Sequence, residues 1–184
     1  MRRIVVAMLL LFVAPLLHAQ KISVSTNLLG YAALGTMNAD VSYSLSRRWS
    51  LTAGAVYNPF TFRKGDPDRQ FQIRQQSYSL GARIWPWHAL SGWWFASKVR
   101  YQEYNMGGVV SRITQEGDRV GMGLYAGYTH MLSDHFNLEF GAGVWTGADF
   151  YMRYSCTTCG ITVGAGTKPF VLPDDFAVSV VYVF

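Results

Sequence analysis

The sequence predicts an all-β protein, an eight-stranded antiparallel up-and-down transmembrane β-barrel. Three observations lead to this fold class. Apolar and polar residues alternate through eight segments of the chain, which is the period of a half-buried strand. The first residues have the pattern of a secretory signal peptide. Beyond them, no apolar run is long enough for a membrane-spanning helix.

Residues 1–19 form the predicted signal peptide. Arg2 and Arg3 precede an apolar run that ends at Ala19, where we expect cleavage. A transmembrane helix is disfavoured, because the run is broken by Pro15 and is short for a span of about 20 residues. Residues 20–184 then form one domain, the barrel.

Composition limits the classes of partner. The formal net charge is +5, and it falls to +3 when the two arginines of the signal peptide leave. This excess is small and scattered along the chain, so we expect no nucleic-acid partner. Aromatic residues make up 15% of the chain, and their positions are used below.

Each predicted strand has one apolar and one polar face. In the first, Ile22, Val24 and Leu28 share a face opposite Lys21 and Ser23. The same alternation runs through every segment, and each has about the length that a tilted membrane strand needs. The eight predicted strands cover residues 21–28, 38–46, 49–58, 75–84, 93–104, 119–128, 136–144 and 176–184.

The connections are expected to alternate in length. Those after the second, fourth and sixth strands are short, and those after the third, fifth and seventh are longer and polar. The longest covers roughly residues 151–173. Short periplasmic turns with longer outer loops are typical of membrane barrels with an even number of strands.

Tryptophans are predicted to mark one membrane boundary. They lie beside the short turns, and such aromatic girdles are found at bilayer interfaces. The predicted girdle comprises Trp49, Trp85, Trp87, Trp93 and Trp94. Tyrosines are expected near the opposite rim, at Tyr31, Tyr57, Tyr101, Tyr104 and Tyr151.

The polar face carries charges of both signs together with glycine and serine. Side chains of this kind suit the narrow, filled interior of an eight-stranded barrel, while the apolar face suits lipid. Unpaired charges would be costly there, so we expect them to pair. The predicted lumen network comprises Asp40, Arg83, Lys98, Arg100, Arg119 and Glu139.

No constellation typical of an enzyme or a metal site is found, and no cofactor is expected. Cys156 and Cys159 fall in the longest loop, where a structural disulfide is favoured over a redox dithiol or a zinc site. His88, His130 and His135 lie at the predicted periplasmic end. A general base near an outer-leaflet nucleophile is therefore missing.

The last strand resembles the C-terminal signal of bacterial outer-membrane barrels. Phe176, Val178 and Val180 alternate into Tyr182, and the sequence ends on Phe184. The resemblance implies that Tyr182 and Phe184 form an assembly signal read by the barrel-insertion machinery. It also implies a Gram-negative outer-membrane location, with outer-membrane lipid and lipopolysaccharide as surroundings.

Four segments, at residues 25–31, 38–43, 49–51 and 57–60, carry a second resemblance. They resemble a family of Bacteroidota envelope proteins of unknown function, whose members often lie near fimbrial genes. The resemblance implies an outer-membrane β-barrel similar in architecture to small OmpA-like eight-stranded barrels. This chain departs from the family pattern at Gly30, which precedes Tyr31, and at Asp40. The matching segments read Ser25-Thr-Asn-Leu-Leu-Gly-Tyr31, Asn38-Ala-Asp-Val-Ser-Tyr43, Trp49-Ser-Leu51 and Tyr57-Asn-Pro-Phe60.

We therefore expect an integral outer-membrane protein that is not an enzyme. Its predicted role is structural or accessory, with outer loops that bind an envelope or fimbrial partner. Three alternatives remain at this point: a narrow ion channel, a lipid A-modifying outer-membrane enzyme, and a secreted soluble barrel that binds an apolar ligand.

Overall fold

The computed structural model describes residues 21–64, 70–108, 113–156 and 160–184. None of the helices within these residues is long and apolar enough to cross a membrane. The elements are β1 (Ile22–Asn27), α2 (Leu28–Ala32), β2 (Met37–Ser44), β3 (Trp49–Asn58), β4 (Thr61–Phe62), β5 (Phe71–Ile84), β6 (Gly92–Gly107), β7 (Thr114–Met131), β8 (Phe136–Tyr154) and β9 (Thr162–Val183).

The strands form a closed antiparallel barrel. Their hydrogen-bonded order is β3-β2-β1-β9-β8-β7-β6-β5, and a pairing between β3 and β5 closes the ring. The short strand β4 pairs only with the end of β5. The predicted fold class is thus confirmed: the chain is all-β, with an eight-stranded up-and-down barrel.

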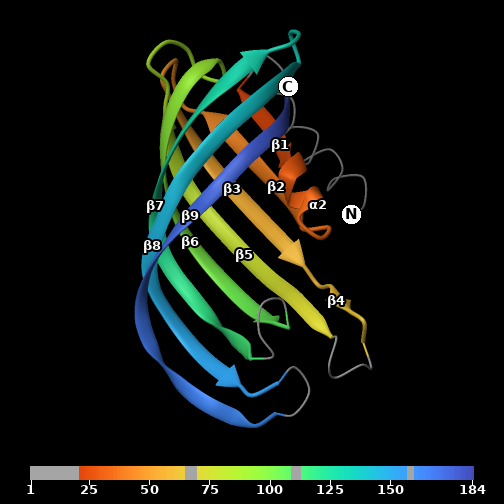
Figure 1. The fold of residues 1–184 in the computed structure, drawn as a ribbon. Helices are drawn as coiled ribbons and strands as arrows, with labels where there is room; N and C mark the ends of the chain where they lie inside the picture. Colours follow the sequence, from red (N-terminus) through yellow and green to blue (C-terminus); the bar gives the residue numbers. More distant parts are fainter. Residues whose placement is uncertain (1–20, 65–69, 109–112, 157–159) are drawn as a thin grey trace, which may run out of the picture.

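Strand length increases around the ring. β1 has 6 residues, whereas β7 has 18 and β9 has 22. The short turns and the last strand's C-terminus lie at one end, and β7, β8 and β9 extend furthest toward the other (Figure 1). We call these the short-turn end and the long-loop end. The barrel wall is therefore shortest at β1 and longest at β9.

Two connections differ from the sequence-based expectation. The predicted loop over residues 151–173 is mostly strand, since β8 continues to Tyr154 and β9 begins at Thr162. The first connection contains α2, which the sequence analysis did not predict. Asn27 caps this helix, and its side chain accepts a hydrogen bond of 3.0 Å from the Leu29 amide.

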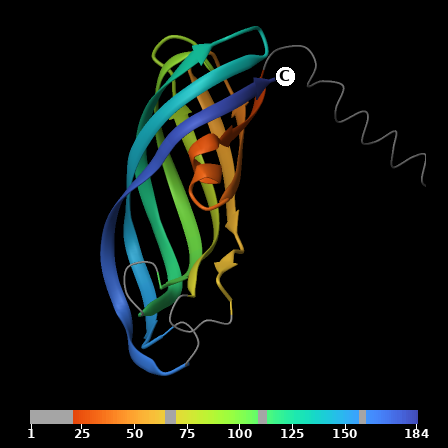
Figure 2. The same ribbon diagram turned by 45° about the vertical axis from the view of Figure 1, so that its right-hand side comes forward.

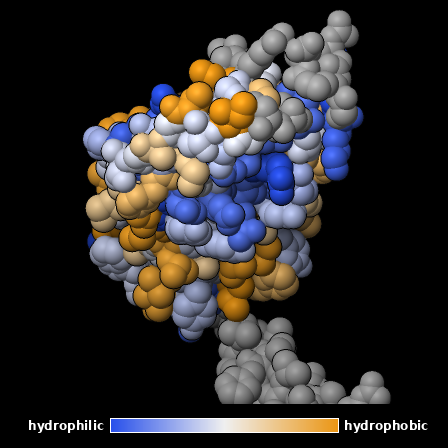
Figure 3. All heavy atoms as spheres, turned by 90° about the horizontal axis from the view of Figure 1, so that it is seen from below, coloured by the Kyte–Doolittle hydropathy of each residue, from blue (hydrophilic) through white to orange (hydrophobic). Residues whose placement is uncertain are grey.

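Side chains alternate between the bore and the exterior. Leu124 on β7 is 72% exposed, whereas its neighbour Tyr125 is 3% exposed. Charged residues Arg83, Lys98 and Glu139 are each 5% exposed. Seen from the long-loop end, hydrophilic residues gather across the middle and hydrophobic ones around much of the margin (Figure 3). The barrel thus presents its apolar face outward.

An apolar cluster fills the bore at the short-turn end. The connection after β5 folds inward and buries Leu90, whose carbonyl accepts a 3.1 Å hydrogen bond from Asn137 Nδ2. Gly127 leaves room for a neighbouring ring, because a Cβ there would lie 2.3 Å from Trp94. The cluster comprises Trp85, Leu90, Trp94, Ala96, Tyr125, Val181 and Val183.

This cluster corrects the predicted girdle. Trp85 is 1% exposed and Trp94 is 3% exposed, so both lie inside the barrel and not on its outer surface. Trp93 and Trp94 are adjacent in a strand, and adjacent side chains point to opposite faces. Inside the barrel, Trp85 donates a 3.0 Å hydrogen bond from Nε1 to Ser50 Oγ of the adjacent strand β3.

Candidate functional site

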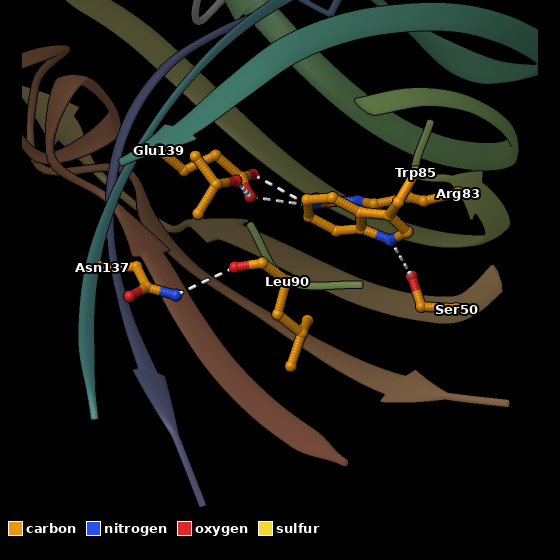
Figure 4. Close-up of polar contacts among 7 residues, drawn as sticks. Ser50, Arg83, Trp85, Leu90, Asn137 and Glu139 are labelled. Atoms are coloured by element: carbon orange, nitrogen blue, oxygen red, sulfur yellow. Dashed lines mark hydrogen bonds and ion pairs between the residues drawn. The ribbon is translucent and has the colours of Figure 1, made fainter. Parts of the chain in front are cut away.

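The bore holds three acid–base clusters, which we name after their carboxylates. The Glu139 tier lies next to the apolar cluster. Arg83 Nη1 lies 3.0 and 2.8 Å from the two carboxylate oxygens of Glu139. Thr129 donates a further hydrogen bond to Glu139, and the Arg83 guanidinium stacks 4.3 Å from the Trp94 ring centroid. Figure 4 shows Arg83 reaching across the bore to Glu139, with Trp85 and Leu90 beside them.

The Asp174 tier lies further along the bore. Arg100 Nη1 approaches Asp174 Oδ2 to 2.6 Å, and the Tyr125 hydroxyl donates to the same oxygen at 2.8 Å. Lys98 Nζ lies 4.8 Å from the centroid of the Tyr125 ring. Arg100 also stacks on Trp145, at 5.3 Å from its centroid. Arg100 is thus held between a carboxylate and an aromatic ring, and Lys98 lies over the Tyr125 ring.

The Asp149 tier lies toward the long-loop end. Asp149 is 0% exposed and accepts a 2.7 Å hydrogen bond from the Tyr104 hydroxyl. Arg119 Nε and Lys168 Nζ lie 3.5 and 3.6 Å from its second oxygen. Arg119 in turn stacks 3.9 Å from the Tyr104 ring centroid. This is the most completely enclosed carboxylate of the three.

The structure brings Arg83 and Glu139 of the predicted network together. Arg100 and Arg119 instead pair with Asp174 and Asp149, which the sequence analysis did not select. Asp40 points into the barrel beside Gly54, where a Cβ would lie 2.4 Å from its Oδ1. Asp149 could have been found, because the alternation of β8 continues from Glu139 through Trp145 to it.

A cavity of about 870 Å³ opens at the long-loop end, above the Asp149 tier. Six strands border it, from β3 through β5 to β9. Tyr104 and Tyr151 were predicted at the aromatic rim. Both instead occupy inward-facing positions of their strands and line this cavity. Near the mouth, a hydrogen bond to Glu116 raises the pKa of the Tyr154 phenol.

The remaining predicted girdle residues are on the exterior. Trp49 is 50% exposed, Trp87 is 76% exposed and Trp93 is 55% exposed. Trp93 packs edge-on against Tyr128 at 5.3 Å.

The predicted assembly signal also faces outward. Tyr182 and Phe184 are exposed on β9 and after it, with ring centroids 4.8 Å apart. Inward-facing Val181 and Val183 alternate with them and belong to the apolar cluster. The terminal strand therefore has the two-faced character that the sequence predicts.

The cysteine prediction falls partly outside the described residues. Cys156 is disulfide-bonded, and Cys159 lies outside the part of the chain that the structure describes. Within the described ranges, no group of three or more His, Cys, Asp or Glu residues could hold a metal ion. The signal peptide, residues 1–19, also lies outside the described residues.

Comparison with known protein families gives one match, to the family described as "Protein of unknown function (DUF3575)". The match covers residues 5–184. The chain belongs to the DUF3575 family. No curated protein and no solved structure matches it.

For this DUF3575 chain, the fold and the bore define what the site can do. The three tiers and the apolar cluster fill the barrel from the short-turn end to the Asp149 tier. The cavity beyond them, at the long-loop end, offers space to a ligand. Its volume lies in the range of small-molecule sites.

Proposed function

We propose that this DUF3575 protein is an integral outer-membrane barrel with a structural or accessory role. The proposal rests on the distribution of side chains, which is the reverse of that in a soluble protein: apolar residues face outward and charged residues face inward. Leu80 and Val171 are 68% and 71% exposed, whereas Arg83 and Asp149 are buried inside the barrel. An apolar exterior of this kind would be unfavourable in water and suits the hydrocarbon of a bilayer.

The dimensions of the apolar surface support this proposal. On β7, the outward residues from Val120 to Tyr128 are apolar, and the next outward residue beyond Val120 is Asp118. That length agrees with the roughly 9–11 residues of a tilted membrane strand. Tyr57, Tyr78 and Tyr101 are exposed near the polar boundary, where interfacial aromatics are enriched.

In the proposed orientation, the short-turn end faces the periplasm and the long-loop end faces outward. That end carries the aromatic residues Phe60, Phe62 and Phe71, of which the last two stack with their ring centroids 4.8 Å apart. Phe60 is 43% exposed. We propose that this end contacts an envelope or fimbrial partner, because binding residues are commonly found in the loops of a rigid scaffold.

Membrane fractionation tests the location. The full chain, expressed in its Gram-negative host, is expected in the outer-membrane fraction and resistant to extraction by alkaline carbonate. It should migrate faster on SDS gels before boiling than after, because a closed barrel stays compact in detergent. Recovery in the soluble periplasmic fraction would instead favour the secreted soluble barrel.

The channel alternative has a separate test. We expect purified protein in planar bilayers to give no resolved conductance steps, because Trp85, Leu90 and the Glu139 tier occupy the bore. Ion flow would require the buried Arg83–Glu139 pair to separate, which is costly. Reproducible steps that disappear on changing Glu139 would favour a channel. For the enzyme alternative, we expect the mass of lipid A to be the same with and without the gene.

A further inference from the structure

The wall of the barrel is incomplete beside the cavity. β1 pairs with β9 only from Ser23–Val183 to Asn27–Ser179. β9 continues to Thr162, and along residues 162–174 its ladder partner within the described residues is β8 alone. Figures 1 and 2 both show β9 running far beyond the point where β1 and α2 stop. One edge of β9 is therefore free, and we call the space beside it the gap.

The end of the β1–β9 ladder is built by one side chain. Asn27 Oδ1 accepts a hydrogen bond of 3.2 Å from the Val178 amide, and Asn27 Nδ2 donates at 3.1 Å to the Phe176 carbonyl. The side-chain amide thus replaces the next residue of a strand. The chain then turns into α2, whose Leu28, Leu29 and Tyr31 are exposed.

Two prolines act against closure of the gap by another strand. Pro169 and Pro173 lie in β9 and pair in register with Ala148 and Val144 of β8. Proline has no N–H, so within sheets it is found with its nitrogen directed at an unpaired edge. Both therefore remove donors from the free edge of β9. Such edges resist strand addition, so we do not expect a partner strand to occupy the gap.

The cavity lies against the gap. Its lining includes residues 165–167 of β9, beside the gap, and residues 57–59 at the end of β3, the strand that follows β1 and β2 around the ring. None of the described residues of β1, α2 or β2 lines it. Six strands of the ring thus border the cavity. On the side of β1, α2 and β2, none of the described strand residues borders it.

The lining side chains are polar but nearly balanced in charge. Glu103, Glu116, Asp118 and Arg74 border the cavity at its rim, where the alternation along their strands directs the side chains outward. The Asp149 tier below adds two cations and one carboxylate, Arg119, Lys168 and Asp149. An anion such as a phosphate would pass three carboxylates at the rim, and the two cations that it would meet inside already contact Asp149. A neutral ligand is favoured.

Amides and phenols supply the remaining groups. Gln75 Oε1 accepts a hydrogen bond of 2.7 Å from Gln102, which leaves the Gln75 Nε2 donors directed at other groups. Tyr151 adds a hydroxyl group to the lining, and the Tyr104 hydroxyl beside it already bonds Asp149 and Gln115. Closely spaced amides, phenols and carboxylates both donate to and accept from hydroxyl groups, and a sugar presents such hydroxyls at high density.

We propose that this cavity binds a saccharide, and that the saccharide is the headgroup of an outer-leaflet glycolipid whose chains leave through the gap. The lipid-linked part rests on the proposed function. On β6, Tyr104 lies three residues beyond Tyr101, the last outward aromatic of the apolar surface. In the proposed orientation the cavity lies at the level of lipid headgroups, and α2, with its exposed apolar residues, lies on the short-turn side of the gap.

The test compares two probes with the same alkyl chain. The purified full chain, in lauryldimethylamine oxide micelles, is titrated with dodecyl maltoside or with octaethylene glycol dodecyl ether, and retained molecules are counted by native mass spectrometry. We expect the maltoside to bind at least roughly tenfold more tightly. Equal retention of the two probes would overturn the saccharide site.

Two tryptophan variants on one strand locate the binding. In Gly166→Trp the new side chain enters the cavity, and a Cβ at Gly166 lies 3.4 Å from the Tyr151 hydroxyl, an ordinary contact. Gly164→Trp is the matched control, because its Cβ meets no atom within 4 Å and Gly164 does not line the cavity. Only Gly166→Trp should abolish the preference for maltoside. A preference that survives in Gly166→Trp would contradict the proposal.

Free maltose distinguishes the source of the sugar. We expect it to displace dodecyl maltoside only in large excess, since it lacks the chain that occupies the gap. Displacement at equal concentration would overturn the lipid-linked assignment. The assay needs no bilayer, so loss of binding in a protein that fractionates with the outer membrane would refute this inference and leave the proposed function standing.

Discussion

Replacing Glu139 with leucine is expected to lower the free energy of unfolding by about 3–5 kcal/mol, because the Arg83 guanidinium would remain buried without its carboxylate. Both members of the pair are buried, and each side chain is 7% exposed. Thr129 would lose its acceptor as well. Urea titration of the barrel refolded into lipid vesicles measures this change.

The double variant Arg83→Leu with Glu139→Leu is the control for the pair. Removing both charges leaves apolar groups in their place, which is often close to neutral for stability. We expect the double variant to be more stable than either single variant, since residues in contact are strongly coupled. Additive losses would show that the two side chains act independently and would contradict the ion pair.

Replacing Asp149, at the other end of the bore, with leucine is expected to lower the free energy of unfolding by a similar amount. Its carboxylate accepts hydrogen bonds from Tyr104 and Gln115 and lies between Arg119 and Lys168. Loss of such a fully buried partner costs about 3–5 kcal/mol when the remaining charges stay enclosed. The same urea titration applies, and hydrogen exchange of β6 to β9 should accelerate first near the long-loop end.

Asp118 provides the matched control for Asp149. It lies one position away from Arg119 on β7, faces outward and accepts a hydrogen bond of 2.6 Å from Tyr101. Because its carboxylate is exposed to water, its contacts contribute little to stability. Asp118→Leu should therefore change the free energy of unfolding by no more than about 1 kcal/mol. Equal losses in Asp118→Leu and Asp149→Leu would contradict the role assigned to burial.

The sequence was sufficient for the fold because the exterior pattern is continuous. Outward residues such as Leu80, Val99 and Leu124 keep a period of two through the apolar surface, and that period predicts strands directly. The same alternation placed Arg83 and Glu139 on the inner face. Their direct contact could not be predicted, because it depends on how strands far apart in sequence face each other across the bore.

The prediction was wrong where strands extend beyond the apolar surface. Outward residues there include Glu103, Glu116 and Asp118, so the contrast between the two faces disappears. Pro169 and Pro173 further interrupt the strand signal of β9. Strands that were expected to have only the length of a membrane crossing left Asp174 at the end of a loop and Asp149 outside the predicted network. Trp85 was misplaced because its turn folds into the bore.

The gradation in strand length has a consequence for how the cylinder comes apart. The first and last strands meet along five residue pairs, from Ser23 to Asn27, whereas β7 and β8 pair from Thr114 to Met131. β1 pairs with β2 along only four residues as well, so this seam and the neighbouring β1–β2 ladder are the weakest lines of the ring. Amide protons of β1 should therefore exchange with solvent before those of β7, and the seam is where the barrel would unzip.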